Sequence, residues 1–321
     1  MRLPTVLDIY EAKRRLAPHL QPTPLLPSHW LSSIADGNVF LKLESLNLTS
    51  SFKIRGALNA ALRLIENSNG ARPQLVTASA GNHGRSLALA AERLGLACVV
   101  FTPATAPGAK KNAIRRHGAV LHGECEDYGV AEQQAKEYAE AEGGVYISPY
   151  NHPDVIAGAG TIGLEIVEAM PGFDVIVIPL GGGGLASGMG LAIKAAAPRV
   201  TIVGVEVEAS APFTLSLEAG RITEITPRQS LADGLTGNLE AGTITFPLVR
   251  QVVDYVVTVS EEDLARAMKG LATEERLIVE GAGVAATAAI MAGKASAPGQ
   301  RVVAMVTGGN VDLPKWLFTI S

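Results

Sequence analysis

Apolar and polar positions along the chain alternate between two periodicities. Short runs of β-branched and aliphatic residues, typical of buried strands, are followed by segments whose apolar residues recur at helical spacing. Strands are predicted at 39–44, 74–78, 97–101, 119–122, 175–178, 200–206, 252–259 and 302–306. Helices are predicted at 54–65, 84–94, 108–117, 128–142, 158–170, 184–194, 281–293 and after Ser260, which forms a capping box with Asp263.

Strands that alternate with helices predict an α/β protein with open parallel sheets, flanking helices and right-handed crossovers. The chain has 321 residues and its pattern restarts after Asn151, so two units are expected. Ligands of such sheets bind where strands end at their carboxyl edge. Three glycine-bearing loops take that position, at 79–84, 181–184 and 307–310.

Composition and charge exclude several classes of protein. Hydrophobic residues make up 47% of the chain, which excludes a disordered protein, and the net charge of −4 argues against a nucleic-acid partner. The uncharged stretch 175–193 contains Pro179 and a glycine run, so we expect a strand, a turn and a helix there and no membrane association. Cys98 is expected in a buried strand, and a metal site at Cys125 is disfavoured because other soft ligands are lacking nearby. A cytoplasmic location is expected, because the amino terminus lacks signal-peptide character.

Four consecutive glycines at 181–184 follow a predicted strand and open a predicted helix. Their backbone N–H groups can approach an anion closely, and the helix N-terminus adds partial positive charge, so phosphate is the natural ligand. A tight turn without a ligand is the plain alternative. A dinucleotide site is another, because Gly181, Gly183 and Ala186 fit the glycine fingerprint and Glu206 ends the next strand near the ribose position.

Two further segments carry candidate chemistry. Lys53 lies at a predicted helix start beside Phe52, where low-dielectric surroundings and the helix end would lower the pKa of its amine and make it a nucleophile. An ordinary surface lysine is the alternative. The loop 79–84 offers backbone N–H groups, a hydroxyl and an amide, which suit a carboxylate ligand. Ser79 or Asn82 could instead serve only as a helix N-cap.

Four motifs together resemble one family. Ser-Phe-Lys-Ile-Arg-Gly-Ala at 51–57, Ser-Ala-Gly-Asn-His-Gly at 79–84, the glycines at 181–184 and Thr-Gly-Gly-Asn at 307–310 occur in the order seen in fold-type II pyridoxal-phosphate enzymes. The most similar branch is the serine/threonine dehydratases and serine racemases, and the resemblance covers nearly the whole chain. It implies a tryptophan synthase β-like fold with the cofactor between two domains, and a homodimer. The small domain would span 48–148 and the large domain 1–47 plus 149–321.

The resemblance also implies a role for each motif. Lys53 would hold the aldehyde of pyridoxal 5'-phosphate covalently and, once substrate displaces it, would take the Cα proton. Phe52 would pack near the ring, Asn82 would bond the 3-hydroxyl, and Thr307 would face the pyridine nitrogen, where the family usually has serine. The phosphate would be held by Gly181, Gly182, Gly183 and Gly184. The substrate carboxylate would be held by Ser79, Ala80, Gly81, Asn82 and His83.

The implied activity is that of an ammonia-lyase, which eliminates water from a β-hydroxy amino acid such as L-threonine or L-serine to give a 2-oxo acid and ammonia. A neutral hydroxyl at Thr307 makes the ring a weaker electron sink, which favours prompt elimination. Ala80 stands where serine racemases carry a second serine, so weak racemisation is expected. The divalent cation of many relatives is left open, because Pro212 stands where an Asp would follow Glu206, and Glu208 or Asp233 could replace it.

Alternatives remain at the level of substrate and class. The loop 231–238 is similar to that of hydroxyectoine-utilisation dehydratases, so a bulkier hydroxyectoine-derived amino acid is an alternative substrate. An NAD-dependent oxidoreductase ranks lower, because it leaves the Lys53 and Asn82 motifs unexplained. A cofactor-binding homologue without turnover and a β-replacing synthase complete the set.

Overall fold

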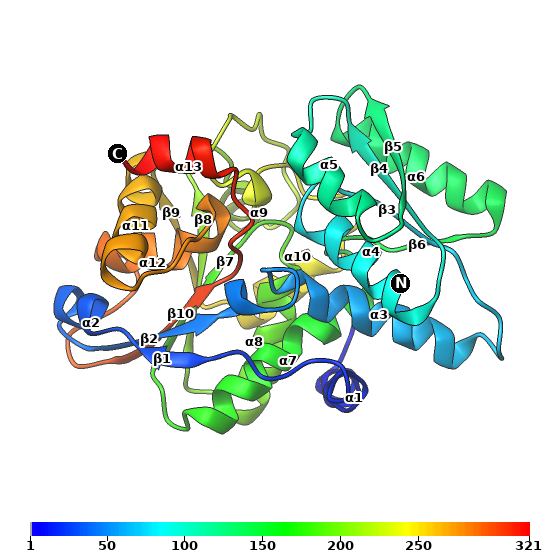
Figure 1. Ribbon diagram of the computed structural model, residues 1–321. Helices are drawn as coiled ribbons and strands as arrows, with labels where there is room; N and C mark the ends of the chain where they lie inside the picture. The colour runs from blue at the N-terminus through cyan, green and yellow to red at the C-terminus, as the bar shows by residue number, and fades with distance from the viewer. Residues whose placement is uncertain (1) are drawn as a thin grey trace.

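The computed structural model describes residues 2–321, whose strands form two sheets (Figure 1). The larger sheet has the order β1-β2-β10-β7-β8-β9, and the smaller has the order β5-β4-β3-β6. The strands of the larger sheet are β1 Leu25–Pro27, β2 Asn38–Leu43, β10 Arg301–Val306, β7 Val175–Pro179, β8 Thr201–Val207 and β9 Tyr255–Val259. Those of the smaller sheet are β5 Val120–Cys125, β4 Cys98–Pro103, β3 Leu75–Ala78 and β6 Val145–Tyr146.

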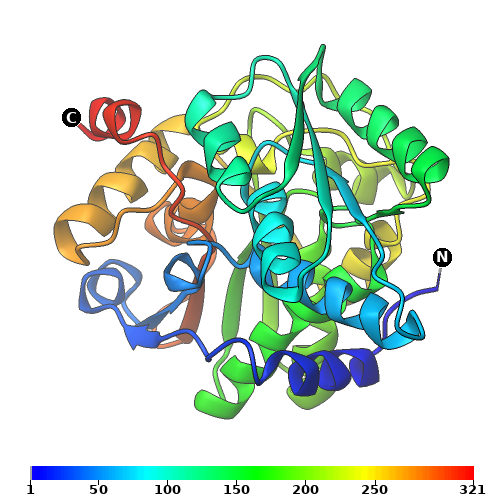
Figure 2. The same ribbon diagram turned by 45° about the vertical axis from the view of Figure 1, so that its right-hand side comes forward.

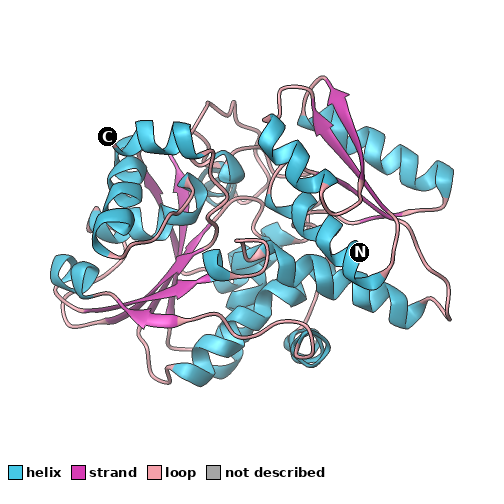
Figure 3. Cartoon of the chain, viewed as in Figure 1, coloured by secondary structure: helices cyan, strands magenta, loops and turns pink. Residues whose placement is uncertain are grey.

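Helices surround both sheets, as Figure 3 shows. In chain order they are α1 Val6–Leu16, α2 His29–Ala35, α3 Lys53–Asn67, α4 Asn82–Leu94, α5 Gly108–Arg115, α6 Tyr128–Glu142, α7 Pro153–Ala169, α8 Gly184–Ala196, α9 Pro212–Ala219, α10 Thr245–Val252, α11 Glu261–Glu274, α12 Ala285–Met291 and α13 Leu313–Ile320. Short 3₁₀ turns lie at η1 Glu44–Leu46, η2 Asp233–Leu235 and η3 Gly281–Val284. Figures 1 and 2 place α1 and α13 on opposite sides of the molecule.

The predicted α/β class is confirmed, with one exception to the parallel pairing. β1 runs antiparallel to β2, with Leu25 opposite Lys42. A parallel crossover needs a dozen or more residues, and only residues 28–37 connect these two strands. The other strand pairs of the described chain are parallel.

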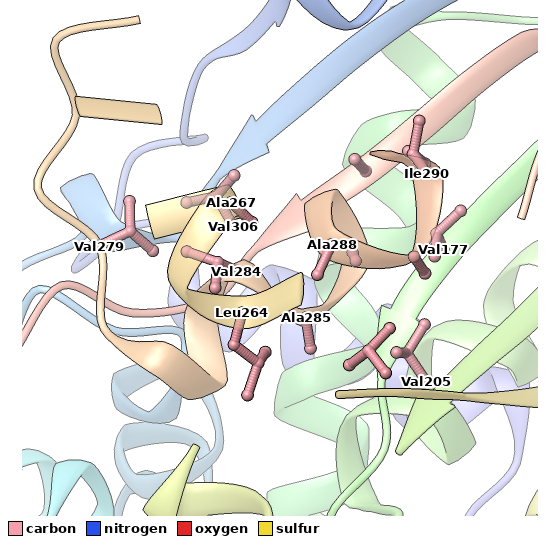
Figure 4. Packing of buried hydrophobic residues seen from close by; sticks show 14 of the residues in the cluster. Val177, Val205, Leu264, Ala267, Val279, Val284, Ala285, Ala288, Ile290 and Val306 are labelled. Carbon is pink, nitrogen blue, oxygen red and sulfur yellow. The ribbon is translucent and has the colours of Figure 1, made fainter. Parts of the chain in front are cut away.

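The larger sheet is buried on both faces, which explains why its strands are continuous apolar runs. Val177 and Val205 pack with Leu264 of α11 and Ala288 of α12 on one face (Figure 4). The alternate residues of β7 and β8, such as Ile176, point to the opposite face and pack against α7 and α8. Burying a side chain of this size contributes roughly 1.5–3 kcal/mol.

The predicted strand 252–259 is wrong at its amino end. Residues 245–252 form α10, whose buried Phe246, Val249 and Val252 recur at helical spacing, and the strand starts only at Tyr255. The predicted helix 281–293 begins as the 3₁₀ turn η3 and continues as the shorter α12. The capping box of Ser260 and Asp263 at the start of α11 is confirmed.

The remaining predictions outside the site concern the membrane and the cysteines. The stretch 175–193 folds as β7, a glycine turn and part of α8, and within residues 2–321 no helix has the length and apolar character needed to cross a membrane. Cys98 lies buried in β4, as expected. Cys125 is buried too, and its thiol donates to Gln134 at 3.3 Å. In the same range, no group of three His, Cys, Asp or Glu side chains is placed to hold a metal ion.

Candidate active site

Three glycine-bearing loops lie at the carboxyl ends of strands, as the parallel pattern predicts. The loop 79–84 follows β3, the glycines at 181–184 follow β7, and the segment 307–310 follows β10. The start of α3 is joined to this edge by backbone hydrogen bonds. The amide of Phe52 donates to the Thr307 carbonyl at 3.1 Å, and the amide of Gly309 donates to the Ser50 carbonyl at 2.9 Å. Lys53 is thereby held beside the end of β10.

These segments enclose a cavity of about 430 Å³. It brings together the predicted site residues Phe52, Lys53, Ser79, Ala80, Gly81, Asn82, His83, Gly181, Gly182, Gly183, Gly184 and Thr307. Four side chains that no sequence motif indicated line the same cavity: Lys110, Tyr128, Tyr150 and Glu280. Of these four, Glu280 could have been predicted from the sequence. It precedes Gly281-Ala282-Gly283, and the other loops of the site likewise combine polar residues with glycines.

Lys53 has the properties of a reactive amine. Burial lowers the pKa of its ammonium to about 8, so a substantial fraction is neutral near physiological pH. Its Nζ donates to the Pro149 carbonyl at 2.9 Å and lies 5.0 Å from the centre of the Phe52 ring. Of the two causes that the sequence predicts for this lowered pKa, burial is the one that acts. A neutral, held amine can attack an aldehyde and form a covalent link.

The glycine turn fits a phosphate group. Gly183 is the N-cap of α8 in a left-handed conformation, with φ of 83°. A Cβ on Gly182 would lie 2.4 Å from the Tyr150 ring, and one on Gly183 would lie 2.6 Å from the Phe213 ring, so side chains would fill or displace the turn. The first N–H groups of a helix lack intrahelical partners and can bind an anion. The residues present therefore fit a phosphorylated cofactor with a reactive carbonyl.

Asn82 and Thr307 lie on the cavity wall with defined partners. Asn82 begins α4; its Nδ2 donates to Glu280 at 2.5 Å, and its Oδ1 accepts from Asn310 at 2.7 Å. Thr307 follows β10 and is buried, and its hydroxyl donates to the Ala282 carbonyl at 3.5 Å. The N-cap of α4 is Gly81, without a side-chain capping bond, so the capping alternative for Ser79 and Asn82 is wrong.

His83 is a buried, neutral ring rather than a base. Its Nε2 lies 3.2 Å from the Ile147 carbonyl, and because a carbonyl only accepts, Nε2 carries the proton. Burial, with a smaller effect of the Lys53 charge, lowers the pKa of His83 to about 3. The imidazole is therefore uncharged throughout the physiological range. It can orient its neighbours, but it cannot take up a proton there.

Glu206 lies behind the cavity rather than in it. Its carboxylate accepts from the Phe213 amide at 2.7 Å, the Thr214 amide at 2.8 Å and the Thr214 hydroxyl at 2.7 Å, which caps the N-terminus of α9. These partners leave the ribose role of Glu206, and with it the dinucleotide alternative, without support. The ring of Phe213 in turn packs against Gly183, so Glu206 supports the glycine turn from behind.

A half-buried lysine with a lowered pKa and a glycine turn that fits phosphate lie in one cavity between the two α/β sheets, the arrangement of a fold-type II pyridoxal-phosphate enzyme. Residues 16–308 match the family described as pyridoxal-phosphate dependent enzyme, and the chain belongs to this family. Pyridoxal phosphate is therefore its cofactor, and the tryptophan synthase β-like fold predicted above is confirmed.

Individual relatives refine this assignment. The chain is 40% identical over 309 residues to the L-threonine ammonia-lyase of Thermotoga maritima, which covers 96% of this chain and 76% of the relative. It is 38% identical over 318 residues to the catabolic L-threonine dehydratase TdcB of Escherichia coli K12, covering 98% and 95%. The structure of maize serine racemase superposes with a TM-score of 0.92 and 31% identity, covering 99% and 97%.

Proposed function

We propose that this chain is an ammonia-lyase that eliminates water from L-threonine or L-serine and releases a 2-oxo acid and ammonia. The observation that carries the proposal is the amine of Lys53 in the phosphate-binding cavity. Because its pKa is lowered, both the neutral and the protonated amine are populated near neutral pH. The similarity to L-threonine ammonia-lyase and L-threonine dehydratase supports the substrate class.

When bound, pyridoxal phosphate supplies an electron sink for cleavage of the Cα–H bond. The residues of this chain do the rest. The loop 79–83 offers backbone N–H groups to the substrate carboxylate, and the amine of Lys53 takes the Cα proton as general base. Thr307 presents a neutral hydroxyl, which cannot hold a charged ring nitrogen as a carboxylate could. That choice favours loss of the β-hydroxyl over reactions that need a long-lived carbanion.

We also propose the domain arrangement that goes with this activity. The small domain would comprise 48–148 and the large domain 1–47 with 149–321, and the two would close over the substrate. Several ion pairs join these parts, and two of them support the proposal because they link the segments that would approach each other: Lys110 contacts Asp233 at 2.5 Å, and Lys136 contacts Glu240 at 2.8 Å. Closure excludes water from the cavity and aligns the reacting groups. The homodimer and the cytoplasmic location stay predictions.

The test is release of 2-oxo acid and ammonia by the purified holoenzyme, screened over L-threonine, L-serine and bulkier β-hydroxy amino acids. We expect turnover of L-threonine or L-serine, and we expect Lys53→Ala to abolish it together with the covalent cofactor. Formation of more D-amino acid than 2-oxo acid from the L-substrate would favour racemisation, which Ala80 argues against. The absence of 2-oxo acid from every substrate tested would refute the proposal.

A further inference from the structure

A line of hydrogen-bonded polar side chains reaches the cavity at Asn82 and ends at Glu280, both of which line it. Arg85 donates to the Oδ1 of Asn310. The Nδ2 of Asn310 donates to the Oδ1 of Asn82 at 2.7 Å and to the Thr49 carbonyl at 2.8 Å. The Nδ2 of Asn82 then donates to the Oε1 of Glu280 at 2.5 Å, across 198 residues of sequence. Four side chains from three parts of the chain are thus connected in one direction.

This line determines which way the Asn82 carboxamide points. If the amide were reversed, its amino group would face the amino group of Asn310 and its oxygen would face the carboxylate of Glu280. Two hydrogen bonds would become two repulsive contacts. An amide nitrogen carries two hydrogens, and only one of them is used by Glu280. The other N–H is therefore available to a group bound in the cavity, which Asn82 and Glu280 both line.

The position of Glu280 is itself fixed by the backbone around it. Its amide donates to the Gly308 carbonyl at 3.1 Å, and its carbonyl accepts from the Gly283 amide at 2.8 Å. A Cβ on residue 308 would lie only 2.0 Å from the Oε1 of Glu280, so the carboxyl group occupies space that only a glycine leaves open. The carboxyl group therefore lies directly against the backbone of Gly308, the residue that follows Thr307.

The charge on this carboxyl group is sensitive to pH near neutrality. Burial raises the pKa of Glu280 to about 7. The hydrogen bond from Asn82 and the charge of Lys110 act against this rise, and the charge of Asp233 adds to it. These are the polar and charged side chains that act on Glu280 from α4, α5 and η2.

We propose that Glu280 is a positioning residue for the cofactor: by accepting from Asn82, it holds the free N–H of that amide toward the ring oxygen of bound pyridoxal phosphate. The proposal rests on the role given to Asn82 above, but not on which amino acid is the substrate. An amide donor held in place stabilises negative charge on that oxygen without having to reorient.

The test is a double-mutant cycle on cofactor affinity, measured by titrating the apoprotein with pyridoxal phosphate. Glu280→Ala is expected to weaken binding about tenfold, equivalent to about 1.4 kcal/mol. In an Asn82→Ala background the same change is expected to have no further effect, because Glu280 acts through Asn82. Glu262→Ala, which removes an exposed carboxylate on α11, is the matched control and is expected to leave affinity unchanged.

Glu280→Gln separates positioning from charge. Its amide oxygen can still accept from Asn82, so affinity is expected to recover to within about threefold of the wild type. The pH dependence of the cofactor's visible absorption through about pH 7 is expected to disappear, because glutamine does not titrate. The melting temperature of each apoprotein reports on folding alone, and both variants are expected to remain folded at the temperature of the titration.

The outcomes are distinct. Additive losses in the cycle, or an unchanged dissociation constant for Glu280→Ala, would overturn the proposal. A Gln variant as weak as the Ala variant would overturn it as well. An Asn82→Ala variant that binds the cofactor like the wild type would remove the role of Asn82 and the proposal with it. Release of 2-oxo acid by the wild type tests the lyase activity separately.

Discussion

A buried network of four charges links the start of α3 to the larger sheet. Arg55, two residues after Lys53, donates to Glu44 at 2.8 and 2.9 Å and to Glu165 at 2.5 and 2.9 Å. Lys42 contacts the same Glu165 at 2.6 Å. Two cations face two carboxylates, and Arg55, Lys42 and Glu44 are at most 2% exposed. The network is electrically balanced only as long as all four members are present.

Glu44→Gln breaks this balance. It leaves a buried Arg55 and Lys42 with one carboxylate between them, and an uncompensated buried charge costs about 3–5 kcal/mol of the free energy of unfolding. Burial alone would raise the pKa of Glu44, but the charge and hydrogen bonds of Arg55 outweigh it and hold that pKa below its ordinary value of 4.5. A carboxylate with a lowered pKa stabilises the fold above its ordinary pKa and loses that contribution as the pH falls below it. The deficit of Glu44→Gln is therefore expected to be full at neutral pH and to shrink in acid.

Urea unfolding of the two apoproteins, at neutral pH and below pH 4.5, measures this difference. Glu66→Gln is the matched control, because Glu66 also pairs with an arginine, Arg15 at 2.9 Å, but is 46% exposed. An exposed pair contributes about 0–1 kcal/mol, so the control is expected to change little. A loss below about 1 kcal/mol for Glu44→Gln, equal to that of the control, would refute the argument from burial.

Three further predictions concern the cavity. Gly182→Ala is expected to weaken pyridoxal-phosphate binding at least tenfold in an apoprotein titration, because its Cβ would lie 2.4 Å from the Tyr150 ring and the turn must move; unchanged affinity would contradict the close approach. The rate at which the apoprotein forms its covalent cofactor adduct, followed by visible absorbance, is expected to rise with pH around pH 8, where Lys53 loses its proton, and a rate that is flat there would contradict the lowered pKa. Lys110→Glu is expected to raise KM, because the new carboxylate would repel Asp233 and hold the two proposed domains apart. Adding Asp233→Lys restores opposite charges and is expected to restore KM; a double variant that does not recover would count against a contact that closes the domains.

Elements bounded by local signals could be predicted from the sequence. The helix predicted at 128–142 has those bounds in the structure, because Asp127 caps its first turn through the Val130 amide and Gly143 ends it in a left-handed conformation. Both residues lie next to the helix they delimit. The end of α10 could not be separated from β9 in this way. Val252 is apolar and buried in either conformation, and no glycine or capping residue divides it from the strand that follows.

The same distinction explains the site. Each loop that the sequence identified is a short continuous motif, so its backbone chemistry could be interpreted before its neighbours were known. Glu280 and Tyr150 reach the cavity from positions far along the chain, and their roles depend on what they meet: Asn82 in one case, Gly182 in the other. The support of Gly183 by Phe213, and of Phe213 by Glu206, is likewise a property of packing. A motif specifies the groups that face the ligand, but only the fold specifies what stands behind them.

The cavity binds a strongly anionic phosphate with little basic charge of its own. Within residues 2–321, two lysines line it. Lys53 would be bonded to the cofactor aldehyde, and Lys110 is paired with Asp233. Attraction to the phosphate must then come from the amides of residues 181–184 and the N-terminus of α8, which are fixed dipoles. Buried dipoles are screened by salt much less than exposed charges. Cofactor affinity should therefore depend weakly on ionic strength. A steep loss of affinity with added salt would show instead that a charged, solvent-exposed side chain provides most of the attraction to the phosphate.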